Sequence, residues 1–130
     1  LVTRFDAAHI VDMLPAPKLV EFAERYCFEG TEVYSYIKAI MPHDIENYGT
    51  VVLGCTHFPL FRQALLRILP AGIDIIDGNK GTVNHLHKLL NELNMLNDSS
   101  EKGSITFFKS GKQVIDSCTL HSYNKILNMV

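Results

Sequence analysis

Hydrophobic and polar positions along the chain follow two spacings, one typical of helices and one typical of buried strands. Where apolar residues recur at every third or fourth position, the spacing predicts an amphipathic helix, and this applies to residues 18–26, 31–40, 60–69, 83–93 and 120–130. A looser helical spacing covers residues 5–14. An unbroken apolar run predicts a short strand at residues 50–54, and two stretches rich in isoleucine and phenylalanine predict further strands at residues 73–77 and 105–108.

The order of these elements indicates the fold class. Strand, helix, strand, helix and strand, joined by short connections, are typical of a parallel α/β sheet. The run at 50–54 ends at Gly54 and has the pattern of a strand buried on both faces. The strands are too few for a complete doubly wound domain, and their edges need cover from elsewhere. We therefore expect an α/β fold made of parallel-sheet segments that are incomplete in this chain.

Composition narrows the class of protein. The chain has 130 residues, of which 47% are hydrophobic and 20% charged, so it can bury a sizeable core and is not disordered throughout. A net charge of -2 leaves no basic footprint, so we expect neither nucleic acid nor a membrane surface as a partner. The three cysteines are an odd and low count, which favours reduced thiols in a cytoplasmic protein over a secreted disulfide scaffold.

Candidate chemistry follows the first predicted strand. Ligands of open α/β sheets bind at the carboxyl ends of the strands, and Cys55 and His57 occupy such an end. Gly54 permits unusual backbone angles, and Pro59 suits a first helical turn, so the intervening amides would favour an anion such as a carboxylate. A helix N-terminus or an imidazole lowers the pKa of a thiol. Cys55 would then act as a base or nucleophile that exchanges protons with His57.

The pattern alone leaves a plainer interpretation open. Buried cysteines are common in strands, and a single Cys-x-His has no diagnostic power, so Cys55 is equally compatible with a structural role. Glu24 neighbours the apolar stripe of its helix, where most glutamates are simply solvated, and spacing does not select it. We expect no metal site, because the chain has no Cys-x-x-Cys pair and no second set of ligands.

Residues 52–60, Val-Leu-Gly-Cys-Thr-His-Phe-Pro-Leu, resemble the second cysteine signature of the aspartate/glutamate racemase family. That signature usually reads Leu-Gly-Cys-Thr-His-Tyr-Pro, so Phe58 replaces a tyrosine. Residues 17–24 resemble the family's Cys-Pro-x-x-Val-Pro-x-x-Glu segment, with Ala16 in place of Cys and Glu21 in place of Pro. Ile75-Ile76-Asp77-Gly78 resembles its Ile-Asp-Ser segment, and the resemblance as a whole covers most of residues 15 to 95.

The resemblance implies a cofactor-independent racemase in which two thiols flank the substrate's alpha carbon. One thiol removes the alpha proton and the other donates a proton to the opposite face. The resemblance places Cys55 as one of these thiols and His57 as its proton-exchange partner. Glu24 would support this side of the site, and Thr56 would bind polar groups of the substrate. His57 favours the glutamate branch, which interconverts L- and D-glutamate for peptidoglycan synthesis.

The resemblance also implies missing parts. The family's first half carries an aspartate and the other cysteine, in a Cys-Asn-Thr setting, and neither is present here. Together with the start at Leu1, this leads us to expect the carboxyl-terminal half of a longer enzyme, inactive without its amino-terminal half. Residues 1–77 would form part of a second α/β lobe, and residues 78–130 would return to complete the first. Whether the protein forms a homodimer is left open by the sequence.

Other functions compete with this one. Within the family, the chain could belong to an aspartate racemase or to a hydantoin or maleate relative, because the pocket that measures substrate length lies mostly elsewhere. A non-catalytic α/β module would retain the motif as packing. A thiol hydrolase or transferase would form a covalent acyl adduct on Cys55, which proton transfer does not.

Overall fold

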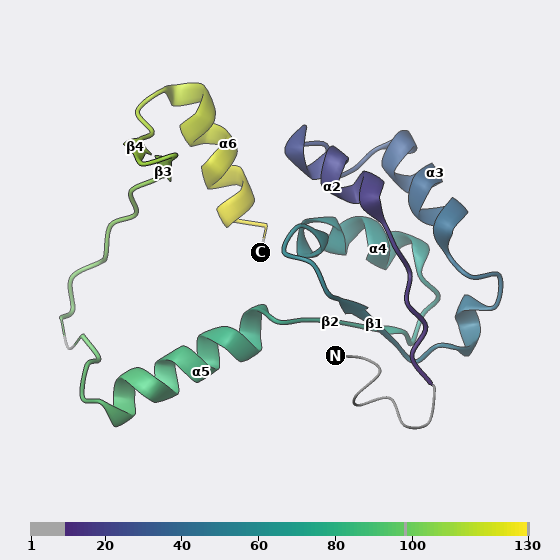
Figure 1. The fold of residues 1–130 in the computed structure, drawn as a ribbon, viewed down its shortest axis with the longest axis horizontal. Coiled ribbons are helices and arrows are strands. Elements are labelled where there is room, and N and C mark those ends of the chain that lie inside the picture. Colours follow the sequence, from purple (N-terminus) through teal and green to yellow (C-terminus); the bar gives the residue numbers. More distant parts are fainter. Residues whose placement is uncertain (1–9, 98, 130) are drawn as a thin grey trace.

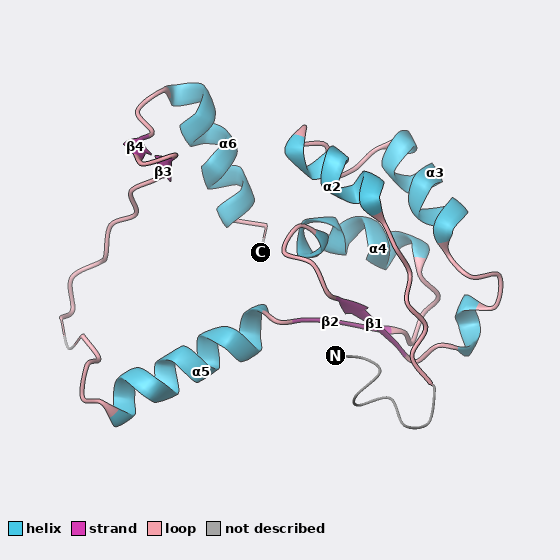
Figure 2. Cartoon of the chain, in the orientation of Figure 1, coloured by secondary structure: helices cyan, strands magenta, loops and turns pink. Residues whose placement is uncertain are grey.

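A computed structural model describes residues 10–97 and 99–129 of the chain (Figure 1). Helices precede and follow each strand of the first part of the chain, and a long loop separates helix α5 (Asn79–Glu92) from the last three elements (Figure 2). The elements are, in order, α2 (Pro17–Glu24), α3 (Thr31–Ile40), the 3-10 helix η1 (Ile45–Asn47), β1 (Thr50–Leu53), the 3-10 helix η2 (Phe58–Phe61), α4 (Arg62–Ile68), β2 (Asp74–Asp77), α5 (Asn79–Glu92), β3 (Phe108–Lys109), β4 (Lys112–Gln113) and α6 (Ser117–Leu127).

Strands β1 and β2 form a parallel pair, which confirms the expected α/β class with a parallel sheet. Leu53 pairs with Asp77 and Val52 with Ile76, so the carboxyl ends of the two strands lie at the same edge. The connection between them runs through η2 and α4. Helices α2, α3 and α4 lie on one side of the strands in Figure 1. This arrangement leaves the turn after β1 at the sheet edge where ligands of α/β proteins bind.

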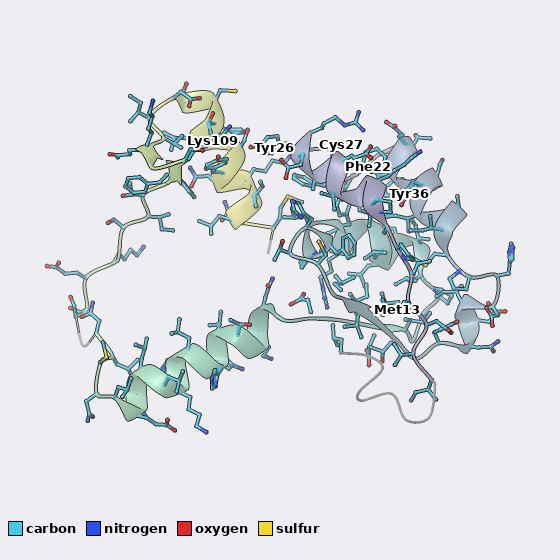
Figure 3. The ribbon with its side chains drawn as sticks, viewed as in Figure 1. Met13, Phe22, Tyr26, Cys27, Tyr36 and Lys109 are labelled. Atoms are coloured by element: carbon cyan, nitrogen blue, oxygen red, sulfur yellow. The ribbon has the colours of Figure 1, made fainter. Side chains whose placement is uncertain are left out.

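One hydrophobic core holds these helices against the sheet. Phe61, Ile37 and Val33 are its fully buried large side chains, and they come from η2 and α3. Phe22 of α2 meets Tyr36 of α3 edge to face, with ring centroids 6.0 Å apart (Figure 3). Such aromatic pairs add to the stabilisation from burial. The core therefore fixes α2 and α3 relative to the turn that follows β1.

The prediction that the first strand is buried on both faces is wrong. Leu53 is buried, but Val52 is 66% exposed and its register partner Ile76 is 50% exposed. Side chains alternate between the two faces of a strand, and within the described residues the helices cover one face. An unbroken apolar run cannot distinguish a strand that is covered on both faces from one whose second face is bare.

The strand predicted at residues 105–108 is also largely wrong. Only Phe108 and Lys109 are extended in a ladder, and they pair antiparallel with β4 in a separate sheet. Ser110 and Gly111 have φ angles of +48° and +77°, the conformation of a tight two-residue hairpin turn. The turn reverses the chain at once, so this segment cannot extend the parallel sheet.

The predicted helices toward the C-terminus form with shifted boundaries. Helix α5 begins at Asn79 and has no buried residue. Helix α6 begins at Ser117 because Asp116 caps it: the carboxylate accepts the backbone N–H of Thr119 at 2.8 Å, which lowers the pKa of Asp116. Ile126 packs against the core as expected, whereas Leu127, also expected inward, is 47% exposed.

The loose helical pattern at the start of the chain falls partly outside the described residues. Residues 5–9 lie there, and residues 10–14 are not helical. Across residues 10–97 and 99–129, no helix combines the length and the apolar character that crossing a membrane requires.

Candidate active site

Cys55, Thr56 and His57 form a tight turn between β1 and η2. The backbone N–H of Phe58 donates to the carbonyl of Cys55 at 3.2 Å, and that of Leu60 donates to the carbonyl of His57 at 3.2 Å. Pro59 stands in the first turn of η2 and is buried with Leu60 and Phe61. The 3-10 helix is therefore anchored in the core, and the turn before it is held at the end of the strand.

Gly54 does not supply the unusual backbone angles expected of it. Its φ lies outside the left-handed region, and a Cβ added there would meet no heavy atom within 4 Å. Nothing in the described residues requires glycine at this position.

The thiol of Cys55 contacts the imidazole of His57. The Sγ atom lies 3.7 Å from Nδ1, and both side chains are partly exposed. The pKa of Cys55 is lowered, first by the backbone N–H of His57 and then by its imidazole, while partial burial opposes both effects. The sulfur is thus neither sealed in the core nor remote from the imidazole, and the environment favours its thiolate.

Glu24 completes a line of three side chains. The Nε2 atom of His57 lies 3.0 Å from Oε1 of Glu24, at the end of helix α2. A carboxylate can only accept, so this contact places a hydrogen on Nε2. In neutral His57 the Nδ1 atom is then free to accept a proton from Cys55. The pKa of His57 is raised, first by Cys55 and then by Glu24, against the opposing effect of burial.

This geometry can carry a proton to and from a sulfur atom. His57 can take the proton of the thiol and, as imidazolium, stabilise the thiolate through Nδ1–H, while Glu24 stabilises the imidazolium from its other side. The His57 side chain is 32% exposed and that of Glu24 is 72% exposed. Solvent therefore reaches the line from the Glu24 end and weakens its electrostatics there.

The amides expected to bind an anion lie in the same turn. The backbone N–H groups of His57 and Phe58 both stabilise the thiolate of Cys55, so the anion they serve within this chain is the sulfur. Thr56 is exposed between the two reactive side chains. Its hydroxyl is placed at the same edge of the sheet, and its role as a substrate ligand stays a prediction.

Among the described residues, no hydrogen bond joins the side chains of the two remaining cysteines to this line. All three cysteines are free; Cys118 is exposed on α6, and the sulfur of Cys27 lies 3.7 Å from the backbone carbonyl of Glu29. Among the described residues, no group of three or more His, Cys, Asp and Glu side chains could hold a metal ion.

The sequence alone predicts only part of this line of side chains. Cys55 and His57 are two positions apart at a predicted strand end, so the local sequence already indicates that their side chains are close. Glu24 lies 33 positions from His57, and helical spacing gave no reason to prefer it to any other exposed glutamate. Only its match to a family motif selected it.

Comparison with known proteins supplies independent information. The chain is 45% identical to a protein named glutamate racemase from Halothermothrix orenii, over all of this chain and 51% of that protein. It is 38% identical to glutamate racemase 2 of Bacillus subtilis, over all of this chain and 49% of that protein. A glutamate racemase of Campylobacter curvus is 43% identical over 98% of this chain and 47% of its own length.

No family model matches the chain. The similarity to these relatives nevertheless extends over essentially the whole sequence rather than over the Cys-Thr-His motif alone. The chain spans about half the length of the curated relatives that it matches. On this evidence the chain is similar, along its whole length, to a part of proteins named glutamate racemase.

Proposed function

We propose that this chain supplies one side of the active site of a glutamate racemase, which interconverts L- and D-glutamate for peptidoglycan synthesis. The observation that carries the proposal is the line Glu24–His57–Cys55 at the carboxyl end of β1, with distances of 3.0 and 3.7 Å. The relatives bear the name of this activity and match the chain along its whole length.

The chemistry follows from the ionisation of the three groups. For one enantiomer, the thiolate of Cys55 takes the alpha proton and becomes a thiol, while a second thiol donates its own proton to the opposite face of the alpha carbon. For the other enantiomer, Cys55 starts as the thiol and donates. His57, held by Glu24, resets the protonation of Cys55 between turnovers. Thr56 would contribute its hydroxyl and backbone amide to the substrate carboxylate.

The second thiol belongs, in this proposal, to a polypeptide equivalent to the amino-terminal half of the relatives. Cys27 contacts the backbone carbonyl of Glu29 and Cys118 lies in α6, and neither is assigned this role. Residues 1–77 would form part of the second lobe, and residues 78–130 would return to the first lobe. The reaction as proposed uses no cofactor, and free thiols suit the reducing cytoplasm. A homodimer is compatible with the proposal but not required by it.

The test joins this chain to the amino-terminal half of the Halothermothrix orenii relative and measures inversion of each glutamate enantiomer in deuterated water. We expect inversion with deuterium at the alpha position, lost in Cys55→Ser and retained in the matched Cys118→Ser. Inversion of aspartate but not of glutamate would indicate an aspartate racemase instead. Inversion that survives Cys55→Ser, or an acyl adduct on Cys55, would contradict the proposal.

The proposal also predicts the activity of the chain in isolation. Because it holds one thiol of the required pair, the isolated 130 residues are expected not to invert glutamate. Measurable turnover by the isolated chain, abolished by Cys55→Ser, would refute the need for a second half.

A further inference from the structure

A second ion pair lies at the sheet edge that carries Cys55. The guanidinium of Arg62 lies 3.7 Å from the carboxylate of Asp77. Asp77 ends strand β2 and pairs with Leu53, two residues before Cys55. Arg62 opens α4 directly after η2. The pair therefore connects the far side of the reactive turn to the neighbouring strand.

Asp77 is the more firmly held member of this pair. Its side chain is 15% exposed, compared with 42% for Arg62. Its Oδ1 atom accepts the backbone N–H of Asn79 at 2.9 Å, which fixes the carboxylate at the start of α5. A carboxylate buried to this extent and bonded on one oxygen is a fixed anchor, whereas a surface ion pair is not.

The reactive turn is thus held from two directions. On the α2 side, Glu24 contacts His57. On the β2 side, Asp77 holds Arg62 at the point where η2 passes into α4. The thiol contact depends on the turn keeping its shape, because Cys55 and His57 are two positions apart within it.

We propose that Arg62 and Asp77 are positioning residues, which clamp the Cys55–His57 turn against the end of β2. The inference rests on the proposed function for its catalytic meaning, but the clamp concerns the geometry of the thiol and can be tested in the chain as it is. Neither residue is assigned a contact with substrate.

The test measures the rate of alkylation of Cys55 against pH, resolved from Cys27 and Cys118 by peptide mass spectrometry. Asp77→Asn keeps an oxygen for the Asn79 amide and removes the charge. If the clamp positions the turn, the thiolate loses its donors, and the rate for Cys55 at neutral pH falls at least about threefold. If Asp77 acts only through its charge, removing a negative group favours the thiolate, and the rate rises.

A double variant separates the effect of the clamp on the turn from the effect of the lost charge. Arg62→Gln with Asp77→Asn removes both charges, so a purely electrostatic effect cancels and the rate stays at the wild-type value. The clamp predicts a fall equal to that of Asp77→Asn alone, because either change already breaks the same contact. Arg62→Lys, which keeps a cation in reach, is expected to stay close to wild type.

Helix α4 offers a matched control. Arg67 lies 3.7 Å from Glu29, the same distance, but away from the turn. Glu29→Gln is expected to leave Cys55 alkylation unchanged. An unchanged or faster rate in Asp77→Asn, in protein whose circular dichroism matches wild type, would overturn the clamp. Wild-type Cys55 that titrates like exposed Cys118 would instead overturn the proposed thiolate chemistry, so the two failures are distinguishable.

Discussion

The Nε2 atom of His57 lies 3.0 Å from a carboxylate oxygen of Glu24, although the two residues are 33 positions apart. The contact exists because Phe22 and Ala23, the buried residues just before Glu24, fix the end of α2 in the core. His57 is fixed from the other side by the buried η2 helix that follows it. Core packing therefore brings the side chains of the candidate site together. A substitution in α2 should then change the ionisation of His57.

Replacing the carboxylate of Glu24 should change the titration of His57. In Glu24→Gln the pKa of His57 falls, because the amide keeps an acceptor for Nε2–H but no longer stabilises the imidazolium. Nuclear magnetic resonance of the imidazole against pH measures this shift directly. Glu21→Gln, on the exposed side of the same helix, is the matched control and should leave the titration unchanged. An identical His57 pKa in wild type and Glu24→Gln would show that the contact is not formed in solution.

The raised pKa of His57 also predicts how stability depends on pH. A group whose pKa is higher in the folded state stabilises that state fully below its unfolded pKa, and the contribution is lost as pH rises through the folded pKa. His57→Gln should therefore lower the free energy of unfolding more in mildly acidic than in alkaline solution. Denaturant titrations of both proteins across this range measure the difference. A difference that grows toward alkaline pH would have the wrong sign.

Substitutions in the core under the site should destabilise the fold far more than substitutions in the second part of the chain. Phe61 is fully buried, and Phe61→Ala is expected to cost about 3–5 kcal/mol of unfolding free energy through lost burial and a cavity. Leu86→Ala, on helix α5 where the side chain is 54% exposed, should change stability by less than about 0.5 kcal/mol. Denaturant unfolding of both variants tests the comparison, and equal losses would contradict the assigned core.

Much of the local structure could be predicted from the sequence. Helices α2 and α3 follow from their apolar spacing, and Pro17 agrees with the start of α2, because a proline suits the first helical turn. Strands β1 and β2 follow from short apolar runs. The Cys55–His57 contact follows from two nearby residues at a strand end, where the backbone geometry is local.

The features that could not be predicted depend on distant parts of the chain. The exposure of Val52 and Ile76 is set by what covers the second face of the sheet, which no pattern within the strands encodes. The Glu24–His57 and Arg62–Asp77 contacts form only once the core has placed α2, α4 and β2. The predicted third strand was wrong because Ser110 and Gly111 form a tight turn that reverses the chain after Lys109.

The proposed function depends above all on Cys55, whose surroundings lower the pKa of its thiol and so favour the release of its proton. The pH midpoint of Cys55 alkylation, measured in the same sample as that of exposed Cys118, tests this most directly. The account predicts a lower midpoint for Cys55, which moves toward that of Cys118 in His57→Gln. Equal midpoints for the two thiols in the wild-type protein would contradict it.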